Sequence, residues 1–196
     1  RRRRVLFFPD QHLGRNTALS MGIPLEEMPV WDPHRDELGG TSRESLHKSR
    51  VVLWRGHCSV HQMFQPEHVA HFRQRYPGIK VLVHPECPRD VVAQADATGS
   101  TGRIIKLVEE SPPGTRWVIG TELHLVNRLK RQHPEQEIFF LSPMVCMCAT
   151  MYRIDLAHLC WSLENLAAGT PVNVIRVDDD AARDALDALR RMLEVK

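Results

Sequence analysis

Val-Val-Leu-Trp-Arg-Gly-His-Cys-Ser-Val-His, residues 51–61, places four apolar residues directly before a polar cluster. A short apolar run rich in β-branched residues is typical of a strand that is covered on both faces in a parallel sheet. The sequence therefore predicts a strand over residues 51–54, with Cys58 shortly beyond its carboxyl end.

The same arrangement recurs on both sides of this stretch. Further apolar runs occupy residues 5–8, 80–83, 117–119, 138–141 and 172–177. Helical patterns occupy residues 66–76, 89–95, 101–110, 123–132, 151–168 and 180–193. Strands that alternate with helices predict crossover connections and an α/β fold with a parallel sheet. Residues 16–40, which are rich in Pro and Gly, are instead expected to form a long functional loop or lid.

The composition indicates a globular protein without a strong overall charge. Of its 196 residues, 42% are hydrophobic, which is enough to build a core, and 26 basic against 24 acidic residues leave a formal charge of +2. No apolar stretch approaches the roughly 18 residues that a membrane span needs. We therefore expect a cytoplasmic protein with no nucleic-acid or membrane partner. Because the chain opens with Arg1 almost inside an apolar run, we also expect it to be a piece of a longer protein.

The cysteines favour chemical roles over disulfides. Their number is odd and small for this length: Cys58, Cys87, Cys146, Cys148 and Cys160. Four of them follow predicted strands, whereas Cys160 lies inside a predicted helix and is expected to be a buried apolar residue. The spacing indicates a metal or thiol site without identifying the metal.

Other polar clusters also follow predicted strands. Ligands bind beyond the carboxyl ends of parallel strands, so these clusters are expected to face one crevice. His84 and Glu86 suit acid–base chemistry or substrate binding, or equally a structural hydrogen bond. Residues 99–101, Gly-Ser-Thr, open a helix and fit either an anion site or an ordinary N-cap.

Taken together, the clusters resemble the quinolinate synthase family along essentially the whole chain. The resemblance is carried by Pro9-Asp10-Gln11-His12-Leu13-Gly14, Trp54-Arg55-Gly56-His57-Cys58-Ser59-Val60-His61, Val83-His84-Pro85-Glu86-Cys87, Ala95-Asp96 with Gly99-Ser100-Thr101, Gly120-Thr121-Glu122 and Cys148-Ala149-Thr150-Met151. The order and spacing of these motifs are highly specific in combination.

The resemblance implies three similar αβα layers around a pseudo-threefold axis, which would be incomplete in this chain. Residues 1–77 would be part of the second αβα domain, and residues 78–150 would be the third. Residues 151–196 would form a C-terminal segment of helix and strand that packs back on the domains.

The resemblance also implies a [4Fe–4S] cluster held by one cysteine from each domain. Cys58 and Cys148 match two of these metal ligands, and the third would lie upstream of Arg1. His84 and Glu86 match the catalytic, substrate-contacting pair, and Thr101 matches a substrate-binding threonine. Cys87 and Cys146 receive no ligand role.

The implied reaction condenses iminosuccinate with dihydroxyacetone phosphate to form quinolinate for NAD biosynthesis, in functional partnership with an aspartate-oxidising enzyme. An open iron of the cluster would act as a Lewis acid. Two alternatives remain open. One is a zinc protein that binds its metal through Cys58, Cys148 and one of His57, His61 and His84; the other is a binding module without activity.

Overall fold

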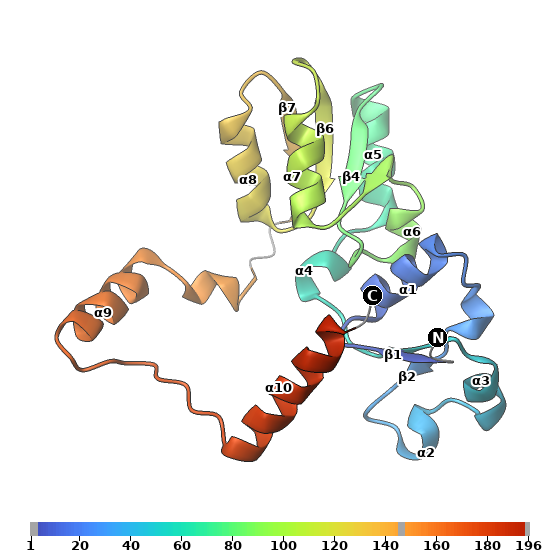
Figure 1. Ribbon diagram of the computed structural model, residues 1–196. Coiled ribbons are helices and arrows are strands. Elements are labelled where there is room, and N and C mark those ends of the chain that lie inside the picture. Colours follow the sequence, from blue (N-terminus) through green and yellow to red (C-terminus); the bar gives the residue numbers. More distant parts are fainter. Residues whose placement is uncertain (1–3, 145–147, 195–196) are drawn as a thin grey trace. The chain divides into compact units, whose positions relative to one another are not determined.

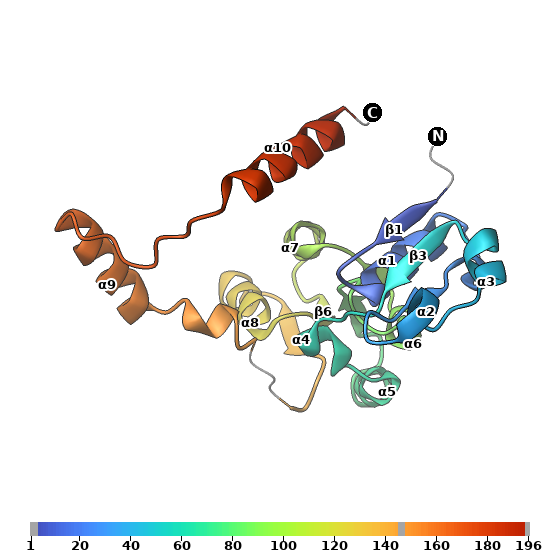
Figure 2. The same cartoon turned by 90° about the horizontal axis from the view of Figure 1, so that it is seen from below.

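The computed structural model describes residues 4–144 and 148–194 and divides the chain into two compact units. The first unit is Arg1–Cys148 and the second is Ala149–Lys196. Figure 1 shows the helices and strands of each unit, and Figure 2 shows them from below. The domain limits suggested by the resemblance stay a prediction.

The first sheet of the larger unit has three parallel strands in the order β1-β3-β2. They are β1 (Val5–Phe7), β3 (Val51–Trp54) and β2 (Val30–Trp31). Helix α1 (Gln11–Ser20) packs on one face of this sheet, where Leu53 is completely buried. The apolar cluster under α1 consists of Ala18, Ile23, Met28, Val51 and Leu53.

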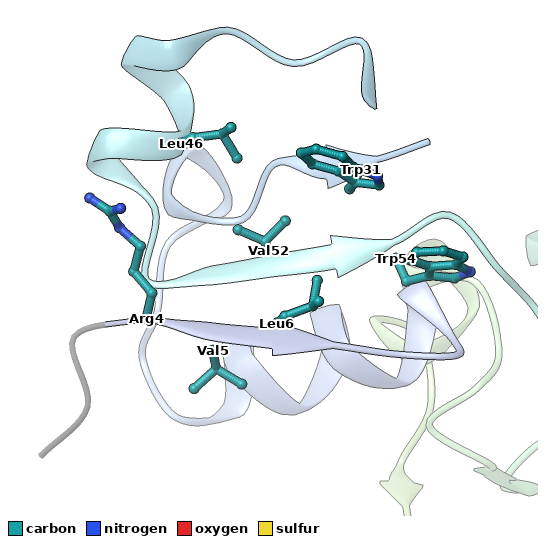
Figure 3. A pocket seen from close by; sticks show the side chains of 7 residues that line it. All are labelled: Arg4, Val5, Leu6, Trp31, Leu46, Val52 and Trp54. Atoms are coloured by element: carbon teal, nitrogen blue, oxygen red, sulfur yellow. The ribbon is translucent and has the colours of Figure 1, made fainter. Parts of the chain in front are cut away.

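The opposite face of this sheet carries an open apolar cavity of about 430 Å³. Side chains alternate between the faces of a strand, so Leu6 and Val52 point away from the face on which Phe7 and Leu53 pack. Figure 3 shows Leu6 and Val52 directed into the cavity, with Leu46 and the indoles of Trp31 and Trp54 around it. Leu6 is 56% exposed as a result.

The second sheet has four parallel strands in the order β5-β4-β6-β7. These strands are β5 (Ala97–Thr98), β4 (Lys80–Val83), β6 (Arg116–Gly120) and β7 (Glu137–Phe140). Strands β4, β6 and β7 lie within a residue of their predicted bounds, whereas β5, which is only two residues long, was not predicted.

Helices cover both faces of the second sheet. On one face, α5 (Pro66–Arg75) and α6 (Arg89–Val92) contribute Val69 and Val91 to a buried cluster with Val81 and Val83. On the other, α7 (Thr101–Glu109) and α8 (Leu123–Gln132) enclose Leu82 and its neighbours on β6 and β7. The predicted α/β fold with parallel sheets and flanking helices is confirmed.

Helix α5 precedes the second sheet in sequence yet packs on it. Phe64 and Val69 are fully buried in the same cluster as Val81. The boundary expected at residue 77 therefore follows α5, although the apolar face of α5 packs on the second sheet. The short helices α3 (Arg43–Lys48) and α4 (Ser59–Gln62) lie on either side of β3 in the sequence.

The expectation of one long loop over residues 16–40 was wrong. This segment contains the end of α1, the 3-10 turn η1 (Leu25–Glu27), strand β2 and the short helix α2 (Asp36–Gly39). Strand β2 is only two residues long and is defined by its pairing with β3, a tertiary interaction that sequence patterning does not reveal.

The second unit contains η2 (Met151–Arg153), α9 (Leu156–Ala167) and α10 (Asp179–Leu193). The strand predicted at residues 172–177 was wrong, because these residues form no helix or strand and Asn173 adopts a positive φ of 57°. Cys160 was expected to be buried, but it is exposed on α9 and its thiol donates to Glu164 Oε1. Within the residues that the structure describes, no helix is long and apolar enough to span a bilayer.

The two faces of the first sheet should respond differently to truncation. Leu53→Ala removes a fully buried side chain beneath α1 and should lower the free energy of unfolding by about 2–5 kcal/mol. Leu6→Ala, on the neighbouring strand and facing the open cavity, should cost less than about 1 kcal/mol. Urea denaturation of the two variants measures both values, and equal losses would contradict an open second face.

Candidate functional site

The buried carboxylate of Asp10 joins the ends of β1 and β3. It caps α1 by accepting a 2.7 Å hydrogen bond from the backbone N–H of Leu13, and its second oxygen accepts from the N–H of Cys58 at 2.9 Å. The chain around Cys58 must approach closely, since a Cβ on Gly56 would lie 2.1 Å from the carbonyl oxygen of Pro9. Only glycine fits there, which fixes the backbone just before Cys58.

A second buried side chain of the same helix holds the loop after β4. Asn16 Nδ2 donates to the carbonyl oxygens of Pro85 and Cys87, at 2.8 and 2.9 Å. These two residues flank Glu86, so α1 fastens the Cys58 loop of the first sheet and the Glu86 loop of the second. The side chains of both loops can therefore meet.

The meeting point is a cluster of Cys58, His61 and Glu86. One ligand-type atom from each residue lies within 4.8 Å of the other two. Glu86 Oε2 is 2.9 Å from His61 Nδ1, in an ion-pair contact whose direction does not satisfy hydrogen-bond geometry. Cys58 precedes α4 and His61 follows it by three positions, so this turn of helix brings the thiol and the imidazole to the same side.

His61 is the most buried member of the cluster, with 8% of its side chain exposed. Burial alone would lower its pKa, but the Cys58 thiol and the Glu86 carboxylate outweigh this effect and raise the pKa of His61 to about 9. Its Nε2 lies 3.3 Å from the hydroxyl of buried Thr121, at the end of β6.

The ring of His84 stacks on that of His61, with centroids 4.6 Å apart. Burial first, and then the neighbouring His61, lower the pKa of His84, so its imidazole is held neutral. His84 Nδ1 accepts from the backbone N–H of Glu86 at 3.2 Å, which leaves the ring proton on Nε2. His84 thus offers an N–H donor beside the Glu86 carboxylate.

The cysteines near this site differ in reactivity. The neighbouring His61 imidazole lowers the pKa of the Cys58 thiol, and the residue is partly exposed, as a metal-binding thiolate requires. Cys87 is fully buried, donates to the carbonyl oxygen of Gly120 and has a pKa that burial raises strongly. Burial thus keeps the Cys87 thiol protonated, in contrast to that of Cys58.

Of the residues singled out in the sequence, Cys58, His84 and Glu86 come together. In the described part of the chain, the cluster within 4.8 Å does not include Cys148, which is partly buried at the end of the larger unit. Thr101 is exposed as the first residue of α7. Cys146 lies outside the described residues.

Three buried polar residues of the site, Asp10, Asn16 and Thr121, were given no role from the sequence. Asp10 could have been found as a capping residue directly after a strand. Asn16 and Thr121 act through contacts that are distant in sequence and carry no local signal.

The fold and the site define an α/β protein with a cysteine-containing polar site at the carboxyl ends of parallel strands. Residues 1–194 match the family model described as Quinolinate synthetase A protein. The match covers nearly the whole chain, so the chain belongs to this family.

Three curated relatives named quinolinate synthase illustrate the similarity. The protein of Rhodopirellula baltica is 67% identical over 196 residues, which are all of this chain and 50% of the relative. That of Geobacillus kaustophilus is 54% identical over 100% of the chain and 53% of the relative, and that of Bacillus mycoides is 51% identical over 97% and 51%. The chain thus spans about half the length of these relatives.

The link between α1 and the Glu86 loop should be measurable as stability. Asn16→Ala deprives the Pro85 and Cys87 carbonyls of their donor, but it also removes an Oδ1 that is buried without a hydrogen bond. The net loss in free energy of unfolding should be about 1–2 kcal/mol. The matched control is Asn127→Ala on the exposed face of α8, which should change it by less than about 0.5 kcal/mol. Equal effects in urea denaturation would refute the link.

Proposed function

We propose that this chain is the part of a quinolinate synthase that carries a large share of its catalytic centre. The reaction condenses iminosuccinate with dihydroxyacetone phosphate and expels phosphate and water to form quinolinate for NAD biosynthesis. Family membership supports the reaction class. The observation that carries the proposal is the convergence of Cys58, His84 and Glu86 from two different sheets.

The chemistry of the donors fits an iron–sulfur cluster. Cys58 is partly exposed and the neighbouring His61 lowers the pKa of its thiol, so it is prepared to bind iron as a thiolate. Cys58 and Cys148 would hold the [4Fe–4S] cluster together with a cysteine from outside this chain. When bound, the cluster supplies Lewis-acid chemistry at an iron that has no protein ligand.

His84 and Glu86 would handle the substrate. The neutral imidazole of His84 can donate its Nε2 proton to a carboxylate or carbonyl oxygen of the substrate. His61 lowers the pKa of the Glu86 carboxyl, so Glu86 is an ionised acceptor for a proton that the condensation releases. Since the two residues are in the same short loop, Asn16 fixes both relative to Cys58.

Thr101 and the N-terminus of α7 would bind an anionic group of the substrate. The Ser100 side chain accepts from the N–H of Arg103, and helix N-termini stabilise anions through their remaining N–H groups and dipole. An aspartate-oxidising enzyme is the class of partner that would deliver iminosuccinate, and the cytoplasm is the expected compartment.

The proposal is tested on the full-length protein, purified without oxygen. We expect a brown protein with broad visible absorption, bound iron and quinolinate-forming activity. The 196-residue chain should show no such activity when assayed alongside it. A colourless full-length protein that contains stoichiometric zinc and forms no quinolinate would refute the proposal.

Glu86→Gln should separate catalysis from cluster binding. In the full-length protein this substitution removes the proton acceptor but no proposed cluster ligand, so iron content should be retained while kcat falls by about 100-fold or more. The control is Glu109→Gln, at the exposed end of α7, which should keep the wild-type kcat. Wild-type turnover in Glu86→Gln would remove Glu86 from the mechanism.

A further inference from the structure

The cluster of Cys58, His61 and Glu86 has the dimensions of a single-metal site. Its three ligand atoms lie within 4.8 Å of one another, and His61 Nδ1 and Glu86 Oε2 are already 2.9 Å apart. In tetrahedral zinc sites the ion is about 2.0–2.3 Å from each ligand, which sets ligand atoms about 3–4 Å apart. A side-chain adjustment of about 1 Å would therefore complete the geometry.

The orientation of the His61 ring also favours the binding of a metal ion. Its Nε2 lies 3.3 Å from the hydroxyl of Thr121, which is 2% exposed and can accept the ring proton. Nδ1 is the nitrogen that faces Glu86, and it is fully buried with no hydrogen-bond partner, so it becomes the ligand atom when a metal ion displaces its proton. Metal-binding histidines characteristically donate their second ring N–H to a neighbouring acceptor, which fixes the tautomer.

The donor set selects among metals. A thiolate together with an imidazole excludes Mg²⁺ and Ca²⁺, which prefer oxygen ligands, and suits Zn²⁺ or Co²⁺. Three protein ligands with an open fourth position are typical of zinc sites that bind water or a substrate. We propose that the chain, when it carries no iron–sulfur cluster, binds one Zn²⁺ ion through Cys58 Sγ, His61 Nδ1 and Glu86.

This site differs from the proposed cluster site in its ligands. The cluster would use Cys58 and Cys148, whereas the zinc site uses Cys58, His61 and Glu86. Because Cys58 belongs to both, zinc and the cluster exclude one another. The zinc proposal does not depend on the proposed function, and substitution of Cys148 distinguishes the two ligand sets.

The test is a Co²⁺ titration of the reduced, metal-free chain. We expect one cobalt per chain, a thiolate-to-cobalt charge-transfer band and the visible bands of a tetrahedral ion, all displaced by Zn²⁺. Cys58→Ser should abolish the charge-transfer band, and Glu86→Gln or His61→Gln should weaken binding at least about tenfold. The control variants Cys148→Ser and Cys160→Ser should bind as the wild type does.

Thr121→Val tests the assigned tautomer without removing a ligand. Loss of this buried hydroxyl should weaken Co²⁺ binding by about 10–100-fold while leaving the charge-transfer band in place. Circular dichroism of each metal-free variant checks that it folds. If His61→Gln does not fold, Glu86→Gln and Thr121→Val are sufficient to test the site. The proposal is overturned if cobalt does not bind, if Glu86→Gln binds as tightly as the wild type, or if the band requires Cys148.

Discussion

The structure of the site depends on the hydrogen bonds that α1 makes to two loops from different sheets. Asp10 at its start accepts from the backbone N–H of Cys58, and Asn16, six residues further on, donates to the carbonyls on both sides of Glu86. Buried polar groups of this kind are costly unless paired, so the pairings specify one arrangement of the loops. Gly56 helps to specify the same arrangement, because only glycine can lie so close to the carbonyl oxygen of Pro9.

This constraint produces the electrostatics of the site. His61 is buried between the thiol of Cys58, in the loop after β3, and the carboxylate of Glu86, in the loop after β4. These two groups together keep the pKa of His61 high despite its burial. The same contacts lower the pKa of Cys58 and of Glu86. His84, stacked on His61, is kept neutral by burial and by that neighbour. Neighbouring groups thus have distinct protonation states, which is the usual basis of acid–base chemistry.

Sequence reasoning predicted the parts of the fold that depend on local patterns. The strands at β3 and β4 were identified because buried parallel strands are continuous apolar runs, and Cys58, His84 and Glu86 were found because they follow those runs. Helix α1 was missed because Gly14, Asn16 and Thr17 are weak helix formers, and tertiary contacts hold it. The link from Asn16 to the Glu86 loop spans about 70 residues and has no local signature.

The most direct test of this account is the titration of the His61 ring nitrogens by NMR, in the reduced chain with a metal chelator. The account predicts a pKa of about 9, because Cys58 and Glu86 both contact the ring, and a lower value in Glu86→Gln. A pKa at or below the ordinary 6.5 in the wild-type chain would contradict it, since the three side chains from the two loops would then not meet.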